Sequence, residues 1–331
     1  MNNRIRRITP ALICLLALLF LIPHAAHARH KRVHKKAVII AMFGTTVEPA
    51  LKSLLNIRRQ MQARFPHTLV KIAFTSNIIR RIWHKRDADP VYRRAHPGVP
   101  ADIINVKGPL AVMADLQDSG FDTLVIQPTF LASGEEFLDL GNYVKALNGI
   151  QTIKKKYKPF NKVALGRPAF GTFGPVHPYS KDIAAAVRAL AGDALAAKKM
   201  GAALFYMGHG NKFFPSGGTY LEFEKVMNQV YPGVHTIVGC VEGFPTRDDA
   251  IAKLKKTGMR KVMLKALMVV AGDHARNDMA GPKASSWLSI LTKEGFKVTP
   301  VIKGLGENDA FAAIFVNHAA DAARDAMINL Q

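Results

Sequence analysis

Cysteine is nearly absent from this 331-residue sequence, which contains only Cys14 and Cys240. Two cysteines cannot build a disulfide scaffold or a cysteine-rich metal cluster, so knottin-like and zinc-finger proteins are excluded. Acidic residues are also few, 24 against 46 Lys+Arg, and the formal net charge is +22. The chain lacks repeated apolar runs of membrane-spanning length, which excludes a polytopic membrane protein. Hydrophobic residues at 49% and charged residues at 21% are typical of a globular, ordered chain.

The first 28 residues have the pattern of a secretory signal peptide. Three arginines precede the apolar run 11–22, and Ala26-His27-Ala28 supplies a small-x-small cleavage site. We therefore predict cleavage after Ala28 and a periplasmic or secreted mature protein without a transmembrane span. The alternatives are a membrane anchor or a buried N-terminal helix, and the export route stays open.

Cleavage after Ala28 would leave 43 basic and 24 acidic residues, a formal charge of +19, and Cys240 as the sole cysteine. The new N-terminal segment 29–36 (RHKRVHKK) is almost entirely basic. We expect it to be a solvated tail, with contact to a polyanion or a membrane surface as the alternative. Nucleic acid is not an expected partner, because the chain is predicted to be exported and lacks basic motifs interleaved with aromatics.

Short apolar runs alternate with helical patterns along the chain, and a length of 331 residues suggests two domains. Strands are expected near residues 37–43, 69–74, 103–106, 123–127, 162–166, 202–208, 236–238, 261–270 and 297–302. Helices are expected near residues 51–61, 108–120, 181–197, 220–230, 247–255 and 309–330. Continuous apolar strands separated by helices indicate an α/β fold with parallel sheets.

Two parts of the chain resemble each other. Residues 123–136 resemble residues 262–274, where an offset of 138 places Glu136 opposite His274, and residues 41–45 resemble residues 206–210. We therefore predict two similar Rossmann-like lobes, residues 29–160 and residues 161–331, the second with the metal site and a closing C-terminal helix. A cleft between the carboxyl ends of their strands is the expected ligand site.

Two histidines and a glutamate follow predicted strands of the second lobe. His209 lies in Met-Gly-His-Gly-Asn, Glu242 in Cys-Val-Glu-Gly-Phe, and His274 in Ala-Gly-Asp-His-Ala. Their spacings of 33 and 32 residues are each about one βαβ unit, so the three side chains can meet at one sheet edge. Two imidazoles and a carboxylate with open positions favour a first-row transition metal. A loop histidine that caps the next helix is the alternative for either histidine.

Several motifs together resemble the anaerobic cobalt chelatases, class II tetrapyrrole chelatases related to the ferrochelatases. They are Phe-Gly-Thr at 43–45, Met-Gly-His-Gly at 207–210, Val-Glu-Gly-Phe-Pro at 241–245, Ala-Gly-Asp-His-Ala-Arg-Asn-Asp-Met-Ala at 271–280 and Gly-Leu-Gly-Glu-Asn at 304–308. The resemblance spans residues 37–320. It implies ATP-independent insertion of Co2+ into sirohydrochlorin on the route to cobalamin. Export departs from the family, whose members are typically cytoplasmic.

The resemblance also implies roles for individual residues. The two histidine ligands fall on His209 and His274, and their acidic partner on Glu242. A second acidic residue falls on Glu136, or on Glu135 beside it. Histidine and glutamate can accept the pyrrole protons near neutral pH, which gives His209 and Glu136 catalytic roles. The residues expected to contact the macrocycle are Phe43, Gly44, Thr45, Gly208 and Arg276.

Other assignments stay open beside this one. The basic charge suits the carboxylate-rich sirohydrochlorin, but Fe2+ and nickel suit the same donors as Co2+. A periplasmic carrier of metal or tetrapyrrole on the same scaffold is the main alternative. An unrelated hydrolase is less favoured, because no Gly-x-Ser-x-Gly nucleophile motif is present. A homo-oligomer is compatible with the sequence.

A haem site is a separate prediction for His96. This histidine follows Arg93 and Arg94 in a stretch rich in proline and glycine, which favours an exposed loop. The arginines suit propionate groups, and a neutral imidazole can be an axial ligand. An ordinary surface histidine is the alternative.

Overall fold

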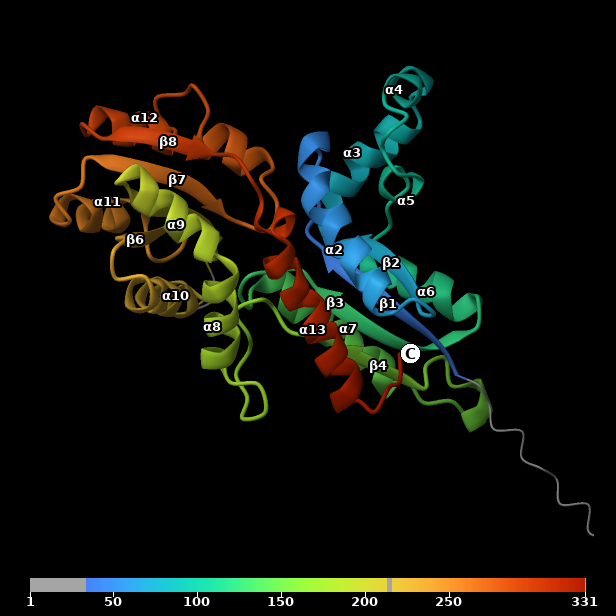
Figure 1. Cartoon of the computed structure of the whole chain (residues 1–331). Helices are drawn as coiled ribbons and strands as arrows, with labels where there is room; N and C mark the ends of the chain where they lie inside the picture. The colour runs from blue at the N-terminus through green and yellow to red at the C-terminus, as the bar shows by residue number, and fades with distance from the viewer. Residues whose placement is uncertain (1–33, 213–215, 331) are drawn as a thin grey trace, which may run out of the picture. The chain divides into compact units, whose positions relative to one another are not determined.

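The computed structural model describes residues 34–212 and 216–330, so the predicted signal peptide lies outside the described residues. Two four-stranded parallel sheets form its framework (Figure 1). The first has the order β2-β1-β3-β4 and the second the order β6-β5-β7-β8. Their strands are β1 Lys35–Met42, β2 Leu69–Phe74, β3 Phe121–Pro128, β4 Lys162–Leu165, β5 Ala203–Gly210, β6 Thr236–Glu242, β7 Lys261–Leu267 and β8 Lys297–Val301. The predicted α/β class with two similar lobes is confirmed.

Helices connect the strands and cover the sheets. Up to β4 they are η1 Glu48–Ala50, α2 Leu51–Arg64, α3 Asn77–Asp87, α4 Pro90–Ala95, α5 Ala101–Ile104, α6 Pro109–Asp118, α7 Glu135–Gly149 and η2 Lys155–Tyr157. Beyond it they are α8 Tyr179–Ala189, α9 Ala191–Met200, α10 Gly217–Val230, α11 Arg247–Lys256, the π-helical turn η3 Ala275–Met279, α12 Trp287–Lys293, η4 Leu305–Glu307 and α13 Asp309–Asp325. In the part of the chain that the structure describes, we find no helix with the length and apolarity needed to cross a bilayer.

The central strands are buried on both faces, as a parallel sheet between helices requires. Every residue from Ala37 to Met42 in β1 and from Ala203 to Met207 in β5 is fully buried. These residues alternate between two cores, so Val38 and Ile40 belong to one cluster while Ala37 and Ile39 belong to another. The apolar runs that predicted strands therefore also account for the packing of both lobes.

Three expected elements are wrong in detail. The run Ile103 to Val106 was expected to be a strand, but helix α5 ends at Ile104. Backbone N–H groups of Ile103 and Ile104 donate to the Pro100 carbonyl at 2.9 and 3.1 Å instead of to a sheet ladder. A short apolar run has no period that separates a strand from a buried helical turn. The helix expected over 181–197 is two helices, α8 and α9, and the strand expected over 261–270 ends at Leu267.

The change from one sheet to the other comes later in the chain than predicted. Strand β4 was expected to open the second lobe, but it pairs with β3 in the first sheet, with Leu124 opposite Val163. A boundary near residue 160 would therefore cut the first sheet. The predicted closing helix, α13, returns to the first lobe and packs on α2, β3 and β4, and it also contacts α8 of the second lobe.

The two sheets match in register as well as in strand order. Ala37 pairs with Leu124 in the first sheet, and Ala203 pairs with Val262 in the second. The β3–β7 offset is therefore 138, as predicted, but the β1–β5 offset is 166, one residue more than the motif alignment used. In this register Phe43 takes the place of His209, and Gly44 takes that of Gly210. Both glycines have positive φ, +98° and +75°, so the strands end in equivalent turns.

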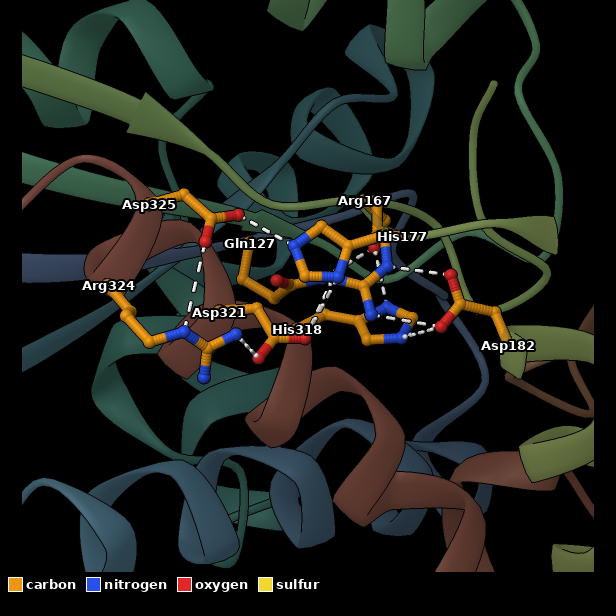
Figure 2. A network of polar contacts seen from close by, with 8 residues as sticks. All are labelled: Gln127, Arg167, His177, Asp182, His318, Asp321, Arg324 and Asp325. Carbon is orange, nitrogen blue, oxygen red and sulfur yellow. Dashed lines mark hydrogen bonds and ion pairs between the residues drawn. The ribbon is translucent and has the colours of Figure 1, made fainter. Parts of the chain in front are cut away.

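A buried polar network joins the lobes where the chain passes from β4 to α8 (Figure 2). Arg167, just after β4, donates from Nε and Nη2 to the two carboxylate oxygens of Asp182 on α8 at 2.6 and 2.9 Å. On α13, His318 Nε2 lies 3.1 Å from Asp182 and Asp321 lies 2.9 Å from Arg167. A bidentate arginine–carboxylate pair fixes orientation as well as distance, so this network sets how α8 and α13 meet.

Candidate functional site

A cavity of about 520 Å³ lies at the carboxyl ends of strands from both sheets. Its lining residues lie at the ends of β5, β6 and β7, in the segments that follow β1, β3, β5 and β7, and on α2, α3, α10 and the start of α7. The predicted residues on its wall are Phe43, Gly44, Thr45, Glu135, Glu136, His209, Glu242 and His274. Parallel α/β sheets bind ligands at this edge, so the topology gathers residues that are far apart in the sequence.

The two predicted histidines lie side by side on this wall. Their ring centroids are 5.1 Å apart, with an angle of 77° between the ring planes. His209 Nδ1 lies 3.0 Å from the Gly210 carbonyl oxygen, and His274 Nδ1 lies 2.5 Å from Asp278 Oδ2. A carbonyl and a carboxylate only accept, so each Nδ1 donates its proton. In the neutral imidazoles this leaves both Nε2 lone pairs for a metal ion.

Glu242 lines the same cavity but faces a cation. It ends β6, is the ladder partner of Gly210, and its Oε1 lies 3.3 Å from Lys212 Nζ. Within residues 34–212 and 216–330, no three His, Cys, Asp or Glu side chains gather closely enough to hold a metal ion. The structure therefore brings the histidines together, and it places Glu242 on the same wall in an ion pair.

Glu135 and Glu136 begin helix α7 on the wall contributed by the first lobe. Carboxylates in the first turn are favoured by the partial positive charge of a helix N-terminus. Glu136 is partly buried and Glu135 is exposed. Gly134, just before them, lies close to the second lobe, because a Cβ there would come 2.9 Å from Asn211 Nδ2. Both carboxylates are thus on the cavity wall, and Glu136 is the more enclosed.

The Phe43-Gly44-Thr45 turn forms part of the cavity wall. Phe43 exposes 46% of its surface, while Thr45 is buried and its carbonyl accepts a hydrogen bond from Trp83 Nε1 at 2.8 Å. A Cβ at Gly44 would lie 2.6 Å from the Phe74 ring, so this turn requires glycine. The turn is fixed by buried contacts, and the phenyl ring of Phe43 is its most exposed side chain.

Two residues expected to contact the macrocycle lie off the cavity wall. Gly208 is buried inside β5, where a Cβ would come 2.9 Å from Tyr220, and Arg276 is exposed on η3. His96 also lies away from the cavity. Its Nδ1 is 2.9 Å from Glu48, and its ring stacks on Tyr92 at 4.1 Å between centroids. The predicted roles of all three residues stay predictions.

Three parts of the site were not predicted from the sequence. Lys212 lies three residues after His209, and Asp278 lies four residues after His274 on the same helical face. That spacing was the available signal for Asp278. The apolar wall formed by Ile78 and Ile82 of α3 carried no motif signal, and Ile78 is 66% exposed.

The fold and the site define a two-lobed α/β protein that presents paired imidazoles and several carboxylates to a cavity at its strand ends. The model of the cobalt chelatase (CbiK) family matches residues 36–324, and the chain belongs to this family.

Characterised relatives agree with this membership. The chain is 29% identical over 286 residues to a sirohydrochlorin cobaltochelatase of Salmonella typhimurium, covering 86% of this chain and 95% of the relative. It is 28% identical over 293 residues to a sirohydrochlorin cobaltochelatase of Nitratidesulfovibrio vulgaris, covering 88% and 91%. The solved sirohydrochlorin chelatase SirB of Bacillus subtilis in complex with cobalt has a TM-score of 0.52 at 11% identity, covering 88% of this chain and 96% of its own. That likeness concerns the fold.

Proposed function

We propose that this chain inserts Co2+ into sirohydrochlorin without ATP, in the cavity at the strand ends. The observation that carries the proposal is the pair His209 and His274, whose Nδ1 atoms are both engaged and whose Nε2 atoms remain available. Membership of the cobalt chelatase family and the two cobaltochelatase relatives support the reaction. Co2+ is the metal substrate here, so a site that binds it and then releases it is required.

The donor set suits a metal in transit. His209 and His274 would supply two nitrogen ligands and Glu242 an oxygen, with the remaining positions left to water or the macrocycle. Because Glu242 is paired with Lys212, it is not assembled with the histidines in advance. A partly assembled site binds metal weakly enough to transfer it, whereas a closed four-ligand site would retain it.

Insertion also requires acceptors for two pyrrole protons. Glu136 lies in the first turn of α7, on the wall contributed by the first lobe, and in the matched register it takes the place that His274 has in the second. We assign proton acceptance to Glu136, with Glu135 as the alternative, and to His209 once its metal has left. Phe43 and Ile78 supply apolar surface for one face of a flat macrocycle.

Metallation of sirohydrochlorin tests the proposal. Protein, sirohydrochlorin and Co2+ are mixed without oxygen, and the absorbance change is followed beside a reaction without protein. We expect insertion at least about tenfold faster than the spontaneous reaction, with Fe2+ measured in parallel as the competing metal. Glu136→Gln is expected to slow it more than the matched variant Glu135→Gln. If the protein binds sirohydrochlorin tightly but does not accelerate the insertion of either metal, the result would contradict the proposal and favour the carrier alternative.

A haem site at His96 remains a secondary proposal. The Glu48 contact engages Nδ1 and leaves Nε2 as the candidate axial ligand. Protein from its native host is expected to show a Soret band that His96→Ala removes without loss of metal insertion. A colourless wild-type protein whose spectrum does not change on addition of haem would end this proposal.

A further inference from the structure

The cavity wall differs in charge from the rest of the molecule. Its described lining residues include four carboxylates, Glu135, Glu136, Glu242 and Asp273, but Lys212 as the one Lys or Arg. The whole chain, by contrast, carries 46 Lys+Arg against 24 Asp+Glu. An acidic wall attracts a divalent cation and repels a carboxylate-bearing macrocycle. The single ammonium group is therefore the one cationic side chain on the described wall that can attract a carboxylate of the macrocycle.

The backbone holds Lys212 within reach of Glu242. Gly210 and Glu242 are ladder partners, and a Cβ at Gly210 would lie 1.8 Å from the Glu242 carbonyl oxygen. A Cβ at Gly243 would likewise lie 2.1 Å from the carbonyl oxygen of Asn211. The segments after β5 and β6 therefore lie backbone against backbone. Side chains larger than hydrogen at either glycine would force these segments apart.

The ion pair is close but weak. Lys212 Nζ lies 3.3 Å from Glu242 Oε1, and the two side chains are 62% and 37% exposed. Exposed ion pairs contribute little, because water and salt screen them. A divalent cation already held by two imidazoles can displace Lys212 from Glu242, and the ammonium group is then free to meet another anion at the same wall.

We propose that Lys212 is a positioning residue that holds Glu242 until metal arrives and then pairs with a carboxylate of the macrocycle. The inference rests on the proposed function, since it takes Glu242 as a metal ligand. Lys212 then has opposite effects on the two substrates. It weakens Co2+ binding because it competes for Glu242, and it strengthens binding of the anionic macrocycle.

Calorimetric titration of the folded protein with Co2+ alone tests the first effect. Lys212→Gln is expected to tighten Co2+ binding about two- to fivefold, while Lys212→Arg is expected to bind as wild type does. Lys225→Gln, which removes an exposed lysine that pairs with Glu222 on α10, controls for the change in total charge. The gain is expected to vanish in the Glu242→Gln background, because the cycle isolates the coupling of the two residues. A gain that persists there, or no gain at all, overturns the proposal.

Steady-state insertion tests the second effect. Lys212→Gln is expected to raise KM for sirohydrochlorin about fivefold with little change in kcat. Lys212→Arg, which keeps the positive charge, is expected to have the wild-type KM. An unchanged KM overturns this part of the proposal. A wild-type protein that binds Co2+ but does not metallate sirohydrochlorin contradicts the proposed function instead, and the Co2+ titration still decides whether Lys212 competes for Glu242.

Discussion

His274 is oriented by a neighbour on its own helical turn. It precedes the π-helical turn η3, and Asp278 four residues later accepts from its Nδ1 at 2.5 Å. A carboxylate at this position fixes the tautomer and raises the basicity of the other ring nitrogen. In the proposed metal site, Asp278 would therefore act on the metal through His274.

We predict that Asp278→Asn weakens Co2+ binding about tenfold, because an amide oxygen holds the imidazole less well than a carboxylate. The fold is expected to stay intact, since both side chains are exposed. Titration with Co2+ measures the effect, with Asp248→Asn on α11 as an exposed control. Unchanged affinity in Asp278→Asn would remove the orienting role.

The sequence predicts the position of a candidate residue where the end of a strand defines that position. His209, Glu242 and His274 each follow an apolar run, and the parallel order of β6, β5 and β7 brings them to one edge. The pairing of Lys212 with Glu242 could not be predicted, because it depends on how the turns after two strands pack. Arg276 was expected to contact the macrocycle because it lies in a matching motif. Its position in that motif did not place it on the cavity wall.

At the scale of elements, the passage between the lobes depends on Asp182 of α8. Burial alone would raise the pKa of this carboxyl, but hydrogen bonds from His318 and Arg167 outweigh that effect and lower the pKa to about 2. A carboxyl with a lowered pKa in the folded state stabilises the fold at pH values above its unfolded pKa, near 4. That contribution, about 2 kcal/mol, is lost as the pH falls from about 4 to 2.

We predict that Asp182→Asn costs about 3 kcal/mol at pH 7, because the buried Arg167 loses its bidentate carboxylate and keeps only the ion pair with Asp321. The variant is also expected to lose less stability than wild type between pH 4 and pH 2. Denaturant unfolding at several pH values measures both effects. Asp325→Asn, at an exposed ion pair with His177, is the control and is expected to cost less than about 1 kcal/mol. Equal stability of Asp182→Asn and wild type would contradict the account.

Most elements can be predicted from apolar periodicity. Where the prediction fails, the following elements show the physical reason. Strand β4 is short, and only its pairing with β3 shows to which sheet it belongs. Helix α5 replaces an expected strand because Pro100 precedes it and the amides of Ile103 and Ile104 donate to the Pro100 carbonyl. The return of α13 to α2 is a long-range contact that no local pattern encodes.

At the scale of the molecule, the net charge of the chain and the charge of the described cavity wall are opposite in sign. For the proposed reaction, the positive net charge of the chain would attract an anionic macrocycle from a distance, and the carboxylates at the strand ends would attract the metal. A rising salt concentration is expected to act mainly on the first of these, because screening weakens long-range attraction most.

Export is a further prediction for the whole chain. Mass spectrometry of the periplasmic or secreted form is expected to find Arg29 as the N-terminal residue, since the sequence before it has the pattern of a signal peptide. An exported form that begins with Met1 would contradict cleavage after Ala28.

The central claim is that His209 and His274 together carry Co2+ into the macrocycle. Its most direct test is the rate of Co2+ insertion into sirohydrochlorin by wild type, His209→Ala and His274→Ala, with the remote variant His235→Ala as the control. Both rings lie on the cavity wall and outside the core, so we expect folded variants. The account predicts that each site variant inserts Co2+ at least about tenfold more slowly, while the control is unchanged. Wild-type rates from both site variants would contradict it.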